Sequence, residues 1–247
     1  MRLKCIGCEV LARPLYLSAA YSPHTVDLEM LRYGLHQNSP DLRKRLQAAI
    51  DAAEGKGYDA VILAYGLCGK STDGLHAGSI PLVLPRAHDC ITIFLGSRQR
   101  YLKEFEETPG TYWYVQDYIE RDDGSGASLS IGANTAGDAE EVRASYVAKY
   151  GQDNADYLME VMGAWQSHYS RAAVIDLGVG DGSNVEQRAR ADAERRGWKF
   201  EKLRGDIGLV QRLVNGDWDK DFLVVQPGQT IKMTYDDEII GCRLETK

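Results

Sequence analysis

The segment YDAVILAYGLCGKSTDGLHAGSIPLVLPRAHDC, residues 58–90, decides the fold class. It holds two short apolar runs, AVIL at 60–63 and LVL at 82–84, and a loop rich in glycine or proline follows each of them. Continuous apolar runs bounded by turn residues are typical of strands buried on both faces of a parallel sheet. We therefore predict two parallel strands whose carboxyl ends, and the loops after them, lie at one edge of the same sheet.

Strand and helix patterns alternate on both sides of this segment. Upstream, RLKCIGCEVL (2–11) alternates like a strand, and SPDLRKRLQAAIDAAEGKG (39–57) reads as a helix with Ser39 as N-cap and Pro40 as its first helical residue. We also expect a helix between His24 and His36. Downstream, the following segments are predicted as helix, strand, helix, strand, helix and strand: 91–107, 171–178, 184–197, 198–203, 206–216 and 221–229.

This alternation predicts an α/β fold of two Rossmann-like halves with mainly parallel sheets that face a central cleft. Residues 1–119 would form the N-terminal half, which carries the Cys and His loops. Residues 139–247 would form the C-terminal half, which carries a glycine-rich loop. Between them, residues 120–138 are poor in apolar side chains and rich in turn formers, so we expect a linker or excursion there.

The composition excludes several classes of function. The 247 residues carry a net charge of −7, which argues against a nucleic-acid partner. No apolar run reaches the roughly 18–20 residues of a membrane span, and the start of the chain lacks the pattern of a signal peptide. Five cysteines in a chain of this size do not predict a disulfide framework. We expect a cytoplasmic protein that acts on a small molecule.

Four possible metal ligands lie at the ends of predicted strands. Cys68 follows the first apolar run, His88 and Cys90 follow the second, and Cys8 ends the first strand of the chain. Thiolate and imidazole are the ligands that zinc prefers, so we predict a zinc site built from these four residues. Asp89 and Arg86 are the predicted catalytic residues beside it. Alternatively, the cysteines are small buried apolar residues.

A glycine-rich loop, VIDLGVGDGSN at 174–184, follows another predicted strand and opens a helix. Its main-chain amides could approach an anionic or ribosyl group at the start of that helix. The predicted cofactor-binding residues are Gly178, Gly180, Asp181 and Gly182. The alternative is a tight turn capped by Ser183 or Asn184.

Aromatic residues cluster in GTYWYVQDYIE, residues 110–120. Tyr112, Trp113, Tyr114 and Tyr118 at this spacing are more often part of a core or an interface than the wall of a cofactor site.

Five segments together resemble a known family. They are YGLCGKSTDGL (65–75), LVLPRAHDCITIFLGSRQRY (82–101), PGTYWYV (109–115), IDLGVGDG (175–182) and DFLVVQPGQ (221–229). The chain resembles DUF1638 over nearly its whole length. Members of that family occur in bacteria and archaea that carry corrinoid-dependent methyltransferases, so the resemblance implies one-carbon metabolism. The string HDC is also similar to the His-x-Cys zinc element of enzymes that methylate thiols from a corrinoid or folate donor, which implies His88 and Cys90 as ligands and Cys68 or Cys8 as a third.

Three functions remain open on this basis. The first is a metal-dependent transferase or lyase, with zinc, that acts on a small polar substrate in methyl or one-carbon transfer and works with a corrinoid protein. The second is an iron–sulfur enzyme in which Cys8, Cys68 and Cys90 bind the cluster and leave one iron open. The third is a non-catalytic accessory protein that binds a small molecule or a corrinoid.

Overall fold

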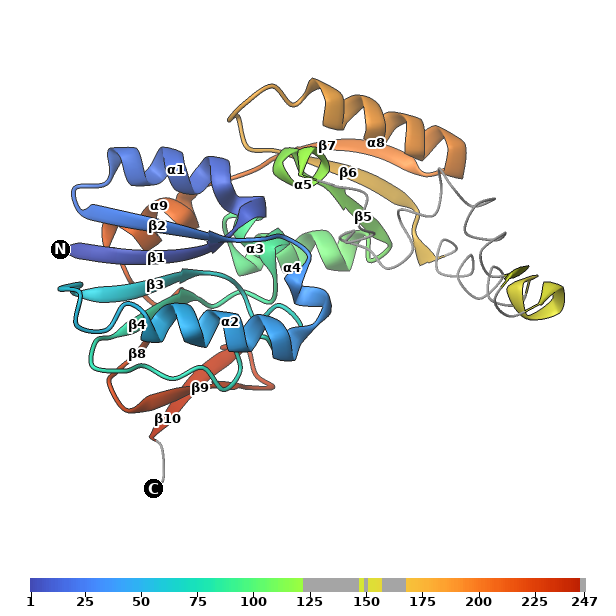
Figure 1. Ribbon diagram of the computed structural model, residues 1–247. Helices are drawn as coiled ribbons and strands as arrows, with labels where there is room; N and C mark the ends of the chain where they lie inside the picture. Colours follow the sequence, from blue (N-terminus) through green and yellow to red (C-terminus); the bar gives the residue numbers. More distant parts are fainter. Residues whose placement is uncertain (122–146, 149–150, 157–167, 245–247) are drawn as a thin grey trace.

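The computed structural model describes residues 1–121, 147–148, 151–156 and 168–244 (Figure 1). Its larger sheet has five strands. The strand order is β2-β1-β3-β4-β8. Neighbours among the first four strands are parallel, and β8 is antiparallel to β4. The strands are β1 (Arg2–Cys8), β2 (Thr25–Leu31), β3 (Ala60–Ala64), β4 (Leu82–Pro85) and β8 (Phe222–Val225).

Helices cover both faces of this sheet, which explains why β3 is apolar at every position. α1 (Ala12–Tyr21) and α9 (Gly208–Asn215) lie on one face, and α2 (Ser39–Asp51) lies on the other (Figure 1). Ile62 shares a buried cluster with residues of α1 and α9, whereas Val61 and Leu63 share one with residues of α2. Because successive side chains of a strand point to opposite faces, the continuous apolar run fills both layers.

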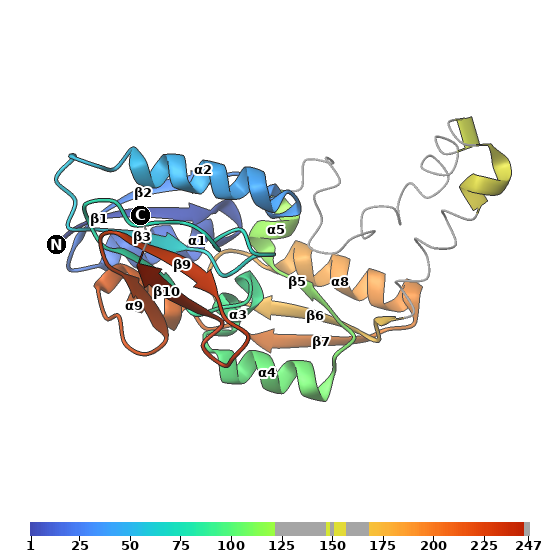
Figure 2. The same cartoon turned by 90° about the horizontal axis from the view of Figure 1, so that it is seen from below.

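The smaller sheet is parallel and has the order β5-β6-β7. Its strands are β5 (Thr111–Tyr114), β6 (Arg171–Asp176) and β7 (Lys199–Arg204), and α8 (Ser183–Arg196) packs on it. Figure 2 shows the carboxyl ends of β6 and β7 pointing toward the larger sheet. Contacts that join the two parts include the bond from Asp206 N–H to the Phe94 carbonyl at 2.9 Å and the ion pair of Arg13 with Asp117 at 2.5 Å.

The remaining elements connect or edge the two sheets. They are η1 (Glu9–Leu11), η2 (Leu35–Gln37), α3 (Cys90–Leu95), α4 (Arg98–Glu107), α5 (Gln116–Glu120), β9 (Gln229–Met233) and β10 (Ile240–Leu244). β9 and β10 form an antiparallel pair. No helix among the described residues is long and apolar enough to cross a membrane.

The predicted α/β class with mainly parallel sheets is confirmed, but the two sheets do not divide the chain at one point. β5, from the predicted N-terminal half, belongs to the smaller sheet, and β8, from the predicted C-terminal half, adds to the larger one. The boundaries 1–119 and 139–247 stay a prediction. Of the predicted linker, only Glu120 and Arg121 lie within the described residues.

Several local predictions were wrong. The segment between His24 and His36 forms the edge strand β2 and not a helix. The N-cap of α2 is Asn38, whose side chain accepts from Asp41 N–H, and not Ser39. The helix expected over 91–107 is two helices, because Gly96 takes the left-handed conformation that ends α3.

Candidate functional site

Three of the predicted ligands line one pocket at the carboxyl edge of the larger sheet. Cys8 ends β1, Cys68 lies in the loop after β3, and Cys90 begins α3 after β4. β3 and β4 are parallel, as predicted, with Val61 opposite Leu82. The pocket encloses about 760 Å³. The carboxyl ends of three neighbouring strands therefore bring these cysteines together.

The two cysteine loops are tied directly to each other. Leu67 N–H donates to the Ala87 carbonyl at 2.8 Å, and Cys68 N–H donates to the His88 carbonyl at 2.9 Å. Gly66 permits this approach, because a Cβ there would lie 2.8 Å from both the Ala87 oxygen and the Asp89 nitrogen. These two main-chain hydrogen bonds thus hold the Cys68 loop against the segment that precedes Cys90.

Cys68 has a backbone conformation that residues other than glycine rarely adopt. Its φ is 45°, and Gly69 and Lys70 follow at 65° and 72°. Strained conformations of this kind cost on the order of 1–3 kcal/mol each and cluster at functional sites. Two side chains of α2 hold the turn: Ser39 Oγ donates to the Gly69 carbonyl at 2.7 Å, and Arg43 donates to the Lys70 carbonyl at 2.6 Å.

The thiols are neutral in this environment. Burial raises the pKa of Cys8 to about 11 and also raises the pKa values of Cys68 and Cys90. The three thiols are close enough for the charge of one to raise the pKa of another. The main-chain amides of Val10 and Gly66 oppose the rise at Cys8 and Cys68, respectively. A bound cation would favour all three thiolates.

Asp89 lines the same pocket as the three cysteines. Its side chain caps α3 by accepting from Thr92 N–H at 3.1 Å. Burial raises its pKa, although the bonds from Thr92 oppose the rise. Burial also raises the pKa of Tyr101 to about 12, and Asp89, which this hydroxyl contacts, adds to that rise. Its charge also raises the pKa values of Cys68 and Cys90, which places Asp89 near these thiols, whereas its catalytic role stays a prediction.

His88 and Arg86 do not line the pocket. The His88 side chain is exposed, and its ring lies 6.3 Å from that of Tyr101. Arg86 turns toward the β9–β10 pair, where it pairs with Glu238 at 3.1 Å and donates to the Ile240 carbonyl. The structure therefore brings together Cys8, Cys68, Cys90 and Asp89 and leaves the other two predicted residues outside.

As the side chains stand, no group of three or more His, Cys, Asp or Glu residues in the described ranges is placed to hold a metal ion. The zinc site stays a prediction.

Several other residues line the pocket that the sequence did not indicate as site residues. His36 lies in η2 near Asp89, and Tyr65 and Tyr118 lie beside the cysteines. Trp113 points to this side of β5, whereas Tyr112 and Tyr114 belong to the buried cluster of the smaller sheet. The alternation of β5 separates these aromatics, and this signal was available in the sequence.

His36 gives a prediction about pH. Burial lowers its pKa below the ordinary value of 6.5, and Asp89 only partly opposes this. The unfolded chain therefore takes up a proton first as the pH falls, so His36 contributes stability above about pH 6.5 that is lost at lower pH. We expect the free energy of unfolding to fall less between about pH 7.5 and 5.5 in His36→Gln than in the wild type, as measured by urea unfolding.

His88→Gln, at an exposed position, is the control for this experiment and should follow the wild-type profile. A profile of His36→Gln that coincides with the wild type would contradict the prediction.

The glycine-rich loop lies apart from the cysteines. Gly178 lines a second pocket of about 950 Å³ at the ends of β6 and β7. Two of the loop's amides already have partners, since Asp176 accepts from Gly178 N–H at 2.9 Å and Asp181 accepts from Ser183 N–H at 3.0 Å. The N-cap of α8 is Gly182, and neither Ser183 nor Asn184 takes that position. Cofactor binding by this loop stays a prediction.

Gly180 is enclosed on both sides. Its φ is 88°, and a Cβ there would lie 2.8 Å from Gln116 Oε1 and 2.9 Å from Arg13 Nε. Gln116 in turn donates to the Asp181 carbonyl at 2.9 Å. These contacts support the role of the loop as a tight turn.

The family model DUF1638, "Protein of unknown function", matches residues 30–214, which is more than half of the chain. The chain belongs to the DUF1638 family. The match includes Cys68, Asp89 and Cys90, whereas Cys8 lies before it. No curated protein and no solved structure matches this DUF1638 chain.

Proposed function

We propose that this DUF1638 protein is an iron–sulfur enzyme in which Cys8, Cys68 and Cys90 bind the cluster and a small molecule occupies the rest of the pocket. The observation that supports this most is the gathering of three thiols, from the carboxyl ends of three neighbouring strands, at one pocket of about 760 Å³. Three thiolates would leave one iron of a four-iron cluster without a protein ligand, and that iron would supply Lewis-acid or redox chemistry.

The donor set supports a cluster more than a single zinc ion. His88, the imidazole of the predicted zinc set, lies outside the pocket. No three candidate side chains of the described ranges converge on one ion. A cluster of several iron atoms spans more space than one ion, so its thiolate ligands need not meet at a point. Amides that favour the thiolates of Cys8 and Cys68 also fit sulfurs that bind a cluster.

The chain's own residues would bind the substrate and hold protons. Apolar side chains of the pocket, such as Ile91 and Ile93, exclude water from the thiols. Asp89, with its raised pKa, and the neighbouring Tyr101 hydroxyl can hold a proton beside the reacting molecule. His36, with its lowered pKa, is a neutral base on the same wall.

Zinc-dependent methyl or one-carbon transfer is a second proposal. His36 lines the same pocket and offers the imidazole that His88 does not. Zinc bound by thiolates and an imidazole can activate a thiol or a carbonyl group. A corrinoid protein as partner belongs to this second proposal.

Metal and sulfide analysis of anaerobically purified protein tests both proposals. We expect a brown protein with about four iron atoms and four acid-labile sulfides per chain, the content of a [4Fe–4S] cluster. About one zinc per chain, without iron, would support the second proposal and contradict the first. Protein that keeps neither metal after reconstitution with iron and sulfide, or with zinc, would contradict both.

A further inference from the structure

Two tyrosine hydroxyls at the thiol end of the pocket are buried and have no hydrogen-bond partner among the described residues. Tyr118 is 4% exposed, and its hydroxyl lies near the sulfurs of Cys90 and Cys8. Tyr65 is 3% exposed, and its hydroxyl faces the Cys8 sulfur, which is only a weak hydrogen-bond acceptor. Both side chains line the pocket. Leaving a buried hydroxyl unpaired destabilises the fold, so such groups call for an explanation.

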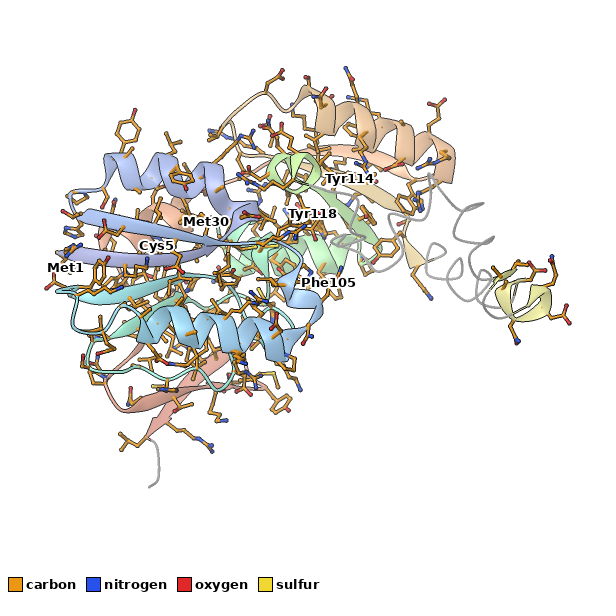
Figure 3. All side chains as sticks on the ribbon, viewed as in Figure 1. Met1, Cys5, Met30, Phe105, Tyr114 and Tyr118 are labelled. Atoms are coloured by element: carbon orange, nitrogen blue, oxygen red, sulfur yellow. The ribbon has the colours of Figure 1, made fainter. Side chains whose placement is uncertain are left out.

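The rings are held in place, so the hydroxyls cannot simply turn away. The ring of Tyr118 packs edge-on against Tyr33, with 5.5 Å between the ring centroids. Tyr65 directly follows β3 and belongs to the buried cluster on the α2 side of the sheet. Figure 3 shows Tyr118 in the region where the two sheets meet. Fixed rings with unpaired hydroxyls are typical of a prepared binding site.

Both hydroxyls remain donors at neutral pH. The ordinary pKa of a tyrosine is roughly 10, so both hydroxyls carry their protons at neutral pH. The Asp89 carboxyl already accepts from Thr92, and Tyr101 also contacts it. The two tyrosine hydroxyls that have no oxygen or nitrogen partner among the described residues are O–H donors, which an oxygen acceptor would satisfy.

The rest of the pocket suits a flat or apolar body. Tyr101 and Phe105 stack on each other along one wall, with 6.4 Å between their centroids, and Trp113 forms part of the wall from β5. The aliphatic side chains of Leu11, Leu35, Leu42 and Ile93 complete the lining. Aromatic walls bind planar molecules by stacking and edge contacts.

We propose that Tyr65 and Tyr118 together bind a carbonyl-type oxygen, of a carboxylate or an amide, on a small planar substrate whose body lies against Trp113 and Tyr101. This inference deepens the proposed function, since it rests on this pocket as the substrate site and names the substrate class. It places the oxygen of the substrate beside the thiols, within reach of whatever they bind.

Fluorine NMR with three small probes tests the inference on the full-length protein, purified anaerobically. 4-Fluorobenzoate and 4-fluorobenzamide carry the acceptor oxygen, whereas 4-fluorobenzylamine has the same ring without it. We expect the wild type to broaden the signals of the benzoate, the benzamide or both, and to leave the benzylamine sharp. Tyr118→Phe and Tyr65→Phe should each weaken binding of the acceptor probe about tenfold, the loss of one hydrogen bond.

Tyr16→Phe, which removes an exposed hydroxyl on α1, is the matched control and should bind the probes as the wild type does. The iron content of every variant is measured in parallel. Full iron with weakened probe binding supports the inference, and probe binding by metal-free protein would uphold it even if the proposed cluster fails. No binding of either acceptor probe to the wild type, or unchanged affinity in folded Tyr118→Phe and Tyr65→Phe, would overturn it.

Discussion

Replacing Cys68 with serine is expected to reduce the bound iron to less than about a tenth of the wild-type content. A serine hydroxyl is a hard, weakly acidic ligand, and an iron–sulfur cluster depends on thiolate sulfur. The substitution changes one atom and leaves the left-handed turn at Cys68 and the bond from its N–H to the His88 carbonyl in place. Iron and sulfide analysis, with the circular dichroism spectrum as a check on folding, measures the effect.

Two cysteines outside the pocket serve as controls. Cys242→Ser changes an exposed thiol on β10, and Cys5→Ala changes a thiol buried within β1 that does not line the pocket. Figure 3 shows Cys5 inside the larger sheet, away from Tyr118. Both variants should keep the wild-type iron content. Equal loss of iron in Cys5→Ala and Cys68→Ser would contradict a site built from Cys68.

The strand-and-loop pattern predicted the position of the site because it depends on local sequence. The apolar runs of β3 and β4 are short, and turn residues follow each of them, so their parallel pairing and shared edge could be predicted. Cys68 and Cys90 follow from that edge directly. His88 lies two residues before Cys90, on an irregular loop. In such a loop, the spacing of two residues in the sequence does not fix which way each side chain points.

Long-range pairing could not be predicted in the same way. β8 reaches the larger sheet from residue 222, and β5 pairs with β6 across more than 50 residues. The local sequence of a short apolar strand does not indicate which of two sheets the strand joins. The pocket residues supplied by these distant segments, such as Trp113 and Tyr118, were therefore assigned to a core or an interface.

His36 was missed because its segment was expected to be helical. The sequence of β2, TVDLEML, contains several good helix formers, and β2 lies at the edge of the sheet with one neighbour, β1. Tertiary pairing decided its conformation. This places η2, and His36 with it, at the carboxyl end of the sheet beside Asp89.

Replacing Gly66 with alanine is expected to lower the free energy of unfolding by about 2–3 kcal/mol and to remove the bound iron as well. Gly66 has no left-handed conformation to lose, so alanine suits its backbone and the effect is steric. The new Cβ would lie 2.8 Å from the Ala87 oxygen and the Asp89 nitrogen, and both are main-chain atoms that cannot turn away. The loops must separate, which breaks the bonds that hold Cys68 against the His88 loop. Urea unfolding and iron analysis measure the two effects.

Gly182→Ala is the matched control for Gly66→Ala. Its backbone also avoids positive φ, and a Cβ there would lie 3.8 Å from Val185, an ordinary contact. Alanine is a poorer N-cap than glycine, so we expect Gly182→Ala to lose about 1 kcal/mol of stability at most and to keep the wild-type iron content. If Gly66→Ala is destabilised but keeps its iron, the close approach of the two loops stabilises the fold and is not needed to align the thiols. If Gly66→Ala matches Gly182→Ala in both measurements, the loops are not in contact as described. Loss of stability and iron together is the result expected if one contact serves both the fold and the site.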